Sequence, residues 1–135
     1  MVDQDELEII NQFLNWVLIG RESEDIFLVT KNGKQFDVPF IMARFTLNSG
    51  LAPKDIELFL LIYDHFDLQE ITRKRISLQS MAELLGCTPK SGTGMNAIKL
   101  WNEGRYDELK EYCAQDVDTT EEVFLKWKKL QETRK

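Results

Sequence analysis

Apolar residues recur every three or four positions in two long parts of the sequence, which is the spacing of a helix with one buried face. The pattern is clearest from residue 109 to residue 127. Its apolar face consists of Leu109, Tyr112, Cys113, Val117, Thr120, Phe124 and Trp127. Residues 4–19 form the second pattern, with Asp3 as a suitable N-cap and Gly20 as the expected end. The sequence therefore predicts a long helix near each end of the chain.

Two short segments predict strands. Residues 26–30 are an unbroken, β-rich apolar run bounded by charge, which is typical of a strand buried on both faces. Residues 63–68 predict a second short strand or extended segment, with Asp67 at its end. The pair Asn32-Gly33 is a turn signal directly after the first run, and residues 38–48 have a helical pattern. The sequence thus predicts a strand-turn-helix unit.

Two shorter helices are predicted in the second half of the chain. Ser77 is a good N-cap for one of them, and Gly86 suits the position after its end. Residues 95–102 form the other, with Ile98 and Trp101 expected to face inward. This mixture of short strands and several helices predicts an α/β protein that is rich in helix.

The 135 residues, 43% of them hydrophobic, have the size and composition of one globular domain, residues 1–135. No apolar run reaches the length of about 18 residues that a bilayer span needs, so no membrane association is expected. The first ten residues lack the basic and then apolar order of a secretory signal. Cys87 and Cys113 have no metal-binding spacing, and His65 is the single histidine. Two unpaired thiols in a chain without a signal indicate a reducing cytoplasm.

The net charge of −6 has the wrong sign for a protein that grips nucleic acid through general basicity. It is compatible with an enzyme whose acidic pocket is neutralised by divalent metal ions, because bound ions reverse the local field. Positive charge gathers at residues 73–75 and near the C-terminus. The second group also has a simple structural explanation, since cations suit the C-terminal end of a helix.

Two carboxylates are candidates for a functional site. Asp116 follows Tyr112 by four residues, so both would lie on one side of the predicted helix. A carboxylate beside an apolar stripe is costly to desolvate without a partner. Asp116 is either bonded to a loop amide or basic side chain, or it is a metal ligand with a helper hydroxyl. Asp37 is either a helix N-cap or a ligand at the carboxyl end of a buried strand, where ligands collect in open α/β sheets.

Two segments resemble motifs of the DEDDy-type 3′–5′ exonucleases, which belong to the RNase H-like superfamily. The segment IFLVTKNGKQFDVPFIMARF is similar to the second motif, through Asn32, Gly33, Phe36, Asp37 and Arg44. The segment KLWNEGRYDELKEYCAQDVDTTEEVF resembles the closing helices and the Tyr-x-x-x-Asp of the third motif, through Tyr112 and Asp116. The resemblance covers nearly all of residues 5–130 and is strongest to the exonuclease domain of family B DNA polymerases.

The resemblance implies two-metal hydrolysis of phosphodiester bonds, with single-stranded nucleic acid bound at its 3′ end. Two divalent ions, Mg²⁺ or Mn²⁺, would stabilise the attacking and leaving oxygens. The residues implied are Asp37 and Asp116 as metal ligands, Tyr112 as a hydrogen-bond partner of the attacking water, Asn32 and Phe36 as contacts of the terminal nucleotide, and Lys90 as a phosphate contact.

The family's first motif, Asp-x-Glu on a central strand, has no counterpart here. Asp3-Gln4-Asp5 has similar spacing but begins a helix. We therefore expect a partial RNase H-like fold with two short parallel strands and about five helices, without the first three strands and inactive alone. Two carboxylates would hold Mg²⁺ weakly. Because an uncovered strand edge invites pairing, we expect self-association or a separate chain that supplies the missing strands. The alternative function is a non-catalytic remnant that binds protein or nucleic acid.

Overall fold

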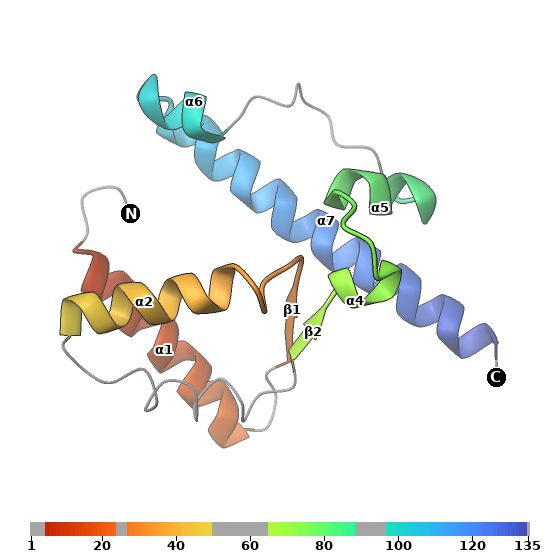
Figure 1. Cartoon of the computed structure of the whole chain (residues 1–135), viewed down its shortest axis with the longest axis horizontal. Helices are drawn as coiled ribbons and strands as arrows, with labels where there is room; N and C mark the ends of the chain where they lie inside the picture. The colour runs from red at the N-terminus through yellow and green to blue at the C-terminus, as the bar shows by residue number, and fades with distance from the viewer. Residues whose placement is uncertain (1–4, 24–26, 50–64, 89–96, 135) are drawn as a thin grey trace. The chain divides into compact units, whose positions relative to one another are not determined.

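The computed structural model describes residues 5–23, 27–49, 65–88 and 97–134 (Figure 1). Within these ranges the chain has six helices and two strands, which confirms the prediction of an α/β fold rich in helix. The chain divides into two compact units, Met1–Glu70 and Ile71–Lys135. No helix in the described ranges is long and apolar enough to cross a membrane.

The first unit contains two long helices that pack together, α1 (Glu6–Ser23) and α2 (Asp37–Ser49). Their shared core is small and apolar, because both helices turn a stripe of aliphatic and aromatic side chains toward each other. It consists of the buried Ile10 and Phe45 and the partly buried Leu7, Leu14, Ile41 and Met42. The two helices are therefore positioned by ordinary side-chain packing, and α2 in turn holds the residues at its own N-terminal end.

The predicted end of the first helix at Gly20 is wrong, because α1 continues through it to Ser23. A glycine inside a helix costs only about 1 kcal/mol relative to alanine, so it does not stop a helix whose backbone bonds continue. At the other end, the Leu7 amide donates to Asp5 Oδ1 at 2.9 Å, so Asp5 caps the helix. The proposed cap Asp3 lies outside the described residues.

The predicted strands pair with each other in parallel, as expected. They are β1 (Leu28–Thr30) and β2 (His65–Asp67), and Thr30 lies opposite Asp67 in the register. The Leu68 amide donates to the Thr30 carbonyl at 2.8 Å, which continues the pairing beyond the last residue of β2. Parallel strands end at the same edge of a sheet, so this register brings Asp67 to the beginning of the turn that follows β1.

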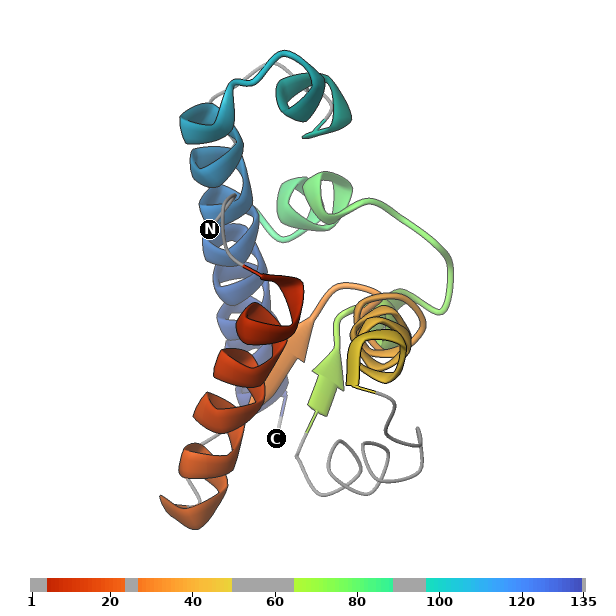
Figure 2. The same cartoon turned by 90° about the vertical axis from the view of Figure 1, so that its left-hand side faces the viewer.

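The second unit is helical. The short α4 (Gln69–Thr72), which the sequence did not predict, contains the boundary between the units. It is followed by α5 (Leu78–Leu84), α6 (Ala97–Asn102) and the long α7 (Tyr106–Thr133). Both α5 and α6 pack against α7 (Figure 2). The segment of residues 89–96 between them, which includes Lys90, lies outside the described residues.

The caps of α5 form as the sequence predicts. Ser77 Oγ accepts a hydrogen bond from the Ser80 amide at 3.0 Å at the N-terminal end. Gly86 has a φ of +68°, and the amide of the next residue, Cys87, bonds to the Ala82 carbonyl at 2.8 Å. This is the arrangement that glycine permits after a helix. The helix α6 ends in the same way at Gly104, whose φ is +70°.

The covered side of α7 agrees with the predicted face only in part. Cys113 and Val117, which the apolar spacing places on this face, are exposed, and the buried residues are Thr119 and Val123. The other predicted positions are half-buried: Leu109, Tyr112, Thr120, Phe124 and Trp127. The covered row includes Asp116 at half burial. The apolar spacing fitted two neighbouring rows of the helix, and the polar Thr119 was not counted among the buried positions.

The inward face predicted for the short helix before α7 is also wrong. Ile98 is 66% exposed and Trp101 is 50% exposed, whereas Leu100 is buried at 3% exposure. A helix of fewer than two turns can cover only one or two side chains against its neighbour, and here that position belongs to Leu100. The ring of Trp101 lies 5.1 Å from the ring of Tyr106 at the start of α7. This aromatic contact accompanies the turn between the two helices.

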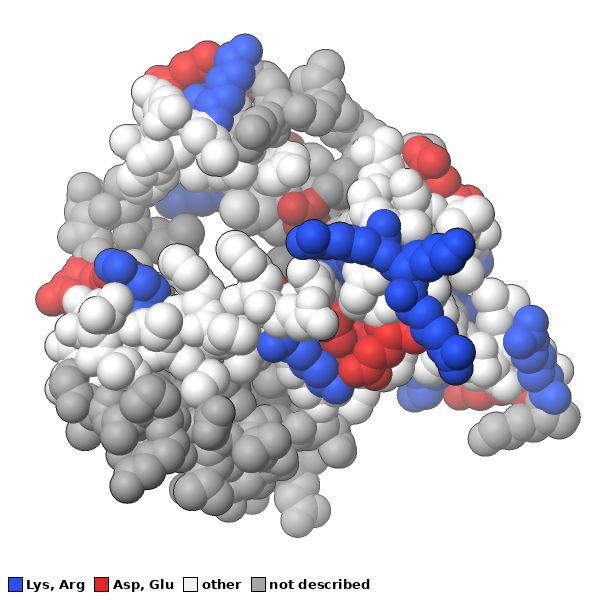
Figure 3. All heavy atoms as spheres, in the orientation of Figure 1, with Lys and Arg blue, Asp and Glu red and all other residues white. Residues whose placement is uncertain are grey.

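Basic and acidic side chains are mixed on the face drawn in Figure 3, where Lys and Arg occur in several separate groups with acidic residues beside them. The mixture agrees with the net charge of −6. Several exposed charges of the described residues are paired, for example Lys34 with Glu70 at 2.7 Å.

Candidate functional site

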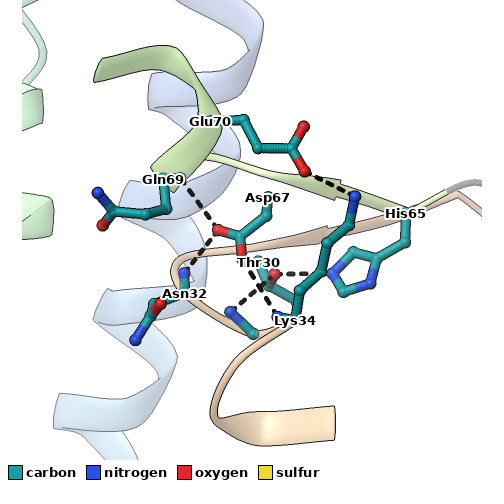
Figure 4. Close-up of polar contacts among 8 residues, drawn as sticks. Thr30, Asn32, Lys34, His65, Asp67, Gln69 and Glu70 are labelled. Atoms are coloured by element: carbon teal, nitrogen blue, oxygen red, sulfur yellow. Dashed lines mark hydrogen bonds and ion pairs between the residues drawn. The ribbon is translucent and has the colours of Figure 1, made fainter. Parts of the chain in front are cut away.

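The turn after β1 is organised around one buried carboxylate, that of Asp67, which is 3% exposed. Its Oδ1 accepts hydrogen bonds from the amides of Asn32 at 2.6 Å and Gln69 at 3.0 Å, and its Oδ2 accepts one from the amide of Lys34 at 3.1 Å (Figure 4). A buried charge is tolerated only where such partners replace water. The carboxylate thus joins the end of β2 to the turn.

The predicted Asn-Gly turn has the geometry that these two residue types favour. Asn32 has a φ of +62°, in the left-handed region that asparagine enters more readily than most residues. Gly33 is buried, and a Cβ atom there would lie 2.4 Å from the Thr30 side chain. The Gly33 amide donates to Thr30 Oγ1 at 3.2 Å. A side chain at position 33 would therefore push the turn away from β1.

The turn leads directly into α2 and so places Asp37. The Phe36 amide donates to the Asn32 carbonyl at 3.0 Å, and the Val38 amide donates to the Gly33 carbonyl at 2.9 Å. The helix begins at Asp37 itself, so this residue occupies the first helical position and not the N-cap position. Its side chain is exposed. The structure therefore presents the Asp37 carboxylate to solvent at the beginning of α2.

Phe36 lies beside Asp37 and is 63% exposed. Its ring is stacked on that of Phe40, with centroids 6.1 Å apart and planes at 11°, and Phe40 is itself 56% exposed. Exposed aromatic pairs are costly to leave in water, and their faces are the groups on which nucleobases stack. The helical pattern of residues 38–48 predicts that Phe40 packs in the core, and its exposure shows that this prediction is wrong.

The charges around the turn come from both sides of it. Lys31 Nζ donates to Gln69 Oε1 at 2.5 Å, and Lys34 Nζ pairs with Glu70 at 2.7 Å. His65 Nε2 lies 2.8 Å from Thr30 Oγ1. Burial, and after it the positive charge of Lys34, holds the pKa of His65 below its ordinary value of 6.5. The imidazole is therefore neutral at pH 7 and acts as a structural partner of Thr30.

The two residues that resemble the third motif lie in the second unit, on α7. Tyr112 and Asp116 are both half-buried and are four residues apart, so they are neighbours on one side of the helix. The Thr120 hydroxyl donates to the Asp116 carbonyl at 2.7 Å, one turn further along. This row of the helix continues to the buried Val123. The predicted neighbourhood of a phenol and a carboxylate on a partly covered helix face is thus present.

The candidate site residues fall into two sets. Asn32, Phe36 and Asp37 are brought together in the first unit, and Tyr112 and Asp116 in the second. Lys90 lies outside the described residues. Across the ranges that the structure describes, no three or more His, Cys, Asp or Glu side chains form a group that could hold a metal ion.

Comparison with protein families gives one match, over residues 61–134, which is more than half of the chain. The family is described as a predicted 3′–5′ exonuclease related to the exonuclease domain of PolB, and the chain belongs to it. The resemblance seen in the sequence is confirmed at this level. The matched segment contains Tyr112 and Asp116, whereas Asp37 precedes it. The comparisons with curated proteins and with solved structures give no significant match.

Proposed function

We propose that the chain is a 3′–5′ exonuclease-type domain that acts on single-stranded nucleic acid and needs further acidic ligands to be active. The observation that carries this proposal is the position of Tyr112 and Asp116, four residues apart on the half-buried side of α7, inside the segment matched to the family. The Asn-Gly turn that leads to the exposed Asp37 supports it from the first unit. The two free cysteines, Cys87 and Cys113, support a location in the cytoplasm.

Asp37 and Asp116 are the proposed metal ligands, for Mg²⁺ or Mn²⁺, because carboxylate oxygens are the ligands that hard divalent cations prefer. Bound metal ions would stabilise the attacking and leaving oxygens of phosphodiester hydrolysis. Two carboxylates are fewer than such a site needs, so the remaining ligands would come from an Asp-x-Glu motif on a separate chain or from self-association. Tyr112, one helical turn before Asp116, would hold the attacking water by a hydrogen bond.

The aromatic pair gives the proposed domain a contact for unpaired bases. Phe36 and Phe40 expose their rings beside Asp37, and stacking on an aromatic ring tolerates any base. Asn32 would contact the terminal nucleotide, and Lys90 a phosphate. Unpaired bases can reach exposed rings, whereas bases inside a duplex are already stacked. The proposed substrate is therefore a single strand.

Mn²⁺ binding to the full chain tests the proposal. Electron paramagnetic resonance of the free ion measures this binding. We expect Asp116→Asn and Asp37→Asn each to weaken binding, because each removes a charged ligand. Asp118→Asn is the matched control, since Asp118 is an exposed carboxylate two residues further along α7. Equal binding by all four proteins would show that Asp37 and Asp116 are not metal ligands.

A nuclease assay with 5′-labelled oligothymidylate tests the catalytic part. The chain alone is expected to leave the strand intact in Mg²⁺ or Mn²⁺. Shortening from the 3′ end that Asp116→Asn abolishes and Asp118→Asn retains would support exonuclease activity and contradict the need for further ligands. Oligonucleotide binding that needs no metal and survives Asp116→Asn would favour the second candidate, a non-catalytic binding module, which the missing three-ligand group in the described ranges also favours.

A further inference from the structure

The carboxylate of Asp67 connects the end of β2 to the turn after β1. A residue at a strand end does not need to make such a connection. Two of the three hydrogen bonds of Asp67 reach residues far away in the sequence, since Asn32 and Lys34 precede it by 35 and 33 residues. Only the third, from the Gln69 amide, is local. The long-range bonds fix the turn after β1 to the end of β2, and they do so from a residue that is 3% exposed.

The hydrogen bonds of the turn carry this restraint forward to Asp37. Asn32, held by Asp67, accepts a bond from the Phe36 amide, and Gly33 accepts one from the Val38 amide. Asp37 lies between these two bonded residues. Asn32 is also in the left-handed region at φ +62°, a conformation that persists where surrounding contacts over-determine it. The Asp67 carboxylate supplies such contacts on both sides of Gly33.

Asp67 is poorly suited to bind a metal ion itself. Both of its oxygens already accept hydrogen bonds from main-chain amides, and the side chain is closed to solvent. An ion would have to displace these amides and leave buried donors without acceptors, which costs free energy. The exposed Asp37, by contrast, is open to an ion.

We propose that Asp67 is a positioning residue, which holds the Asn32–Lys34 turn so that Phe36 and Asp37 are presented in one fixed arrangement. The inference rests on the proposed function for the role of Asp37, but the positioning itself is a property of the turn. Groups that orient a metal ligand typically change metal affinity by about 10-fold to 100-fold when they are removed.

The decisive variant is Asp67→Asn. An amide side chain has one acceptor oxygen in place of two, so at least one of the amides of Asn32 and Lys34 loses its acceptor. In this variant, exchange of the backbone amide hydrogens of Phe36 and Val38, measured by NMR, is expected to become at least 10-fold faster. The amides of α7 are expected to keep their protection. Glu70→Gln is the matched control, because it removes an exposed acid beside the turn and leaves the three amide bonds in place. Unchanged exchange at Phe36 and Val38 in Asp67→Asn overturns the inference.

Mn²⁺ binding gives the second measurement. Where the wild-type chain binds Mn²⁺ through Asp37, Asp67→Asn should weaken binding by about 10-fold or more, and Glu70→Gln should not. Binding of wild-type strength in Asp67→Asn overturns the inference even if exchange is faster. Where the wild type binds no Mn²⁺, the proposed role of Asp37 as a metal ligand of the chain alone fails, and the exchange measurement alone decides whether Asp67 positions the start of α2. Loss of the helical circular dichroism signal in Asp67→Asn would also overturn it, since the role would then be one of general stability.

Discussion

At the scale of single residues, β2 contains two titratable groups, Asp67 and His65, which differ in the number of polar groups that compensate them. The Asp67 carboxylate is compensated by three amide donors, whereas His65 has one polar partner, Thr30, and a lysine nearby. Burial is the first cause of the lowered pKa of His65 and the charge of Lys34 is the second. Protonation of this imidazole is therefore opposed by the folded state.

The lowered pKa of His65 predicts how stability depends on pH. The pKa of His65 is about 6.5 in the unfolded chain, so the unfolded chain binds the proton more readily than the folded chain. The contribution of the neutral His65 to the free energy of unfolding is therefore complete above pH 6.5. It is lost as pH falls through the folded pKa. Lys34→Met should raise the pKa of His65 without restoring it fully, because burial remains. NMR titration of the imidazole measures this, with Lys31→Met as the control. An unchanged pKa in Lys34→Met would contradict the electrostatic part.

The stacked pair on α2 predicts a measurable contribution to binding of single strands. Phe40→Ala removes one ring and leaves Phe36 and Asp37 in place, so the affinity for oligothymidylate should fall by about 10-fold, as stacking is worth about 1–3 kcal/mol per base. Fluorescence anisotropy with a labelled strand measures this change. Leu47→Ala is the matched control, because Leu47 is 74% exposed on the same helix. An equal loss in both variants would indicate a general apolar effect.

At the scale of elements, α1 and α2 are joined by an ion pair as well as by their apolar core. Arg44 donates to both oxygens of Glu6, at 2.5 Å from Nε and 2.6 Å from Nη2. The hydrogen bond from Arg44 is the main reason why the pKa of Glu6 is below its ordinary 4.5. Arg44, which the sequence resemblance places in the second motif, joins α1 to α2 in this structure.

This pair predicts a stabilisation that acid removes. Because the folded pKa of Glu6 is lowered, its contribution is present above pH 4.5 and is lost as pH falls through the folded pKa. Glu6→Gln should therefore lower the midpoint of thermal unfolding at pH 7, and the difference between the variant and the wild type should shrink as pH falls below 4.5. Circular dichroism melting at pH 7 and at a series of lower pH values measures this. Glu8→Gln, one exposed acid on the same helix turn, should change the midpoint little, and an equal effect would contradict the specific pairing.

Local signals predicted the elements well where one residue type was sufficient to define them. Ser77 and Gly86 mark the two ends of α5 as expected, and the two short segments predicted as strands pair in parallel. The local signals failed where packing against other elements determines the end of a helix or its covered side. Gly20 continues α1, and Val117 is exposed while Thr119 is buried, because packing partners select which side of α7 is covered. No pattern in the sequence could assign the turn amides to Asp67, since that contact forms only when β1 and β2 pair.

At the scale of the whole molecule, the sequence could place Asp37 and Asp116 on their elements but not in one site. Each residue is presented within its own unit, Asp37 at the first position of α2 and Asp116 on the covered row of α7. Local patterns such as caps and helical spacing act over a few residues, whereas a shared ion would join positions 79 residues apart, from 37 to 116. Such an arrangement has to be tested by coupling between the two positions.

Two ligands of the same metal ion should not contribute independently. Saturating Mn²⁺ stabilises a folded protein by about 2.7 kcal/mol when its concentration is 100 times the dissociation constant. If Asp37 and Asp116 bind one ion, Asp37→Asn and Asp116→Asn should each remove most of this stabilisation, and the double variant should lose little more, because neighbouring groups of one site are not additive. Urea unfolding with and without Mn²⁺ measures the three losses, and Asp118→Asn should keep the wild-type value. Losses that add in the double variant would instead mean two separate ions, one bound by each unit.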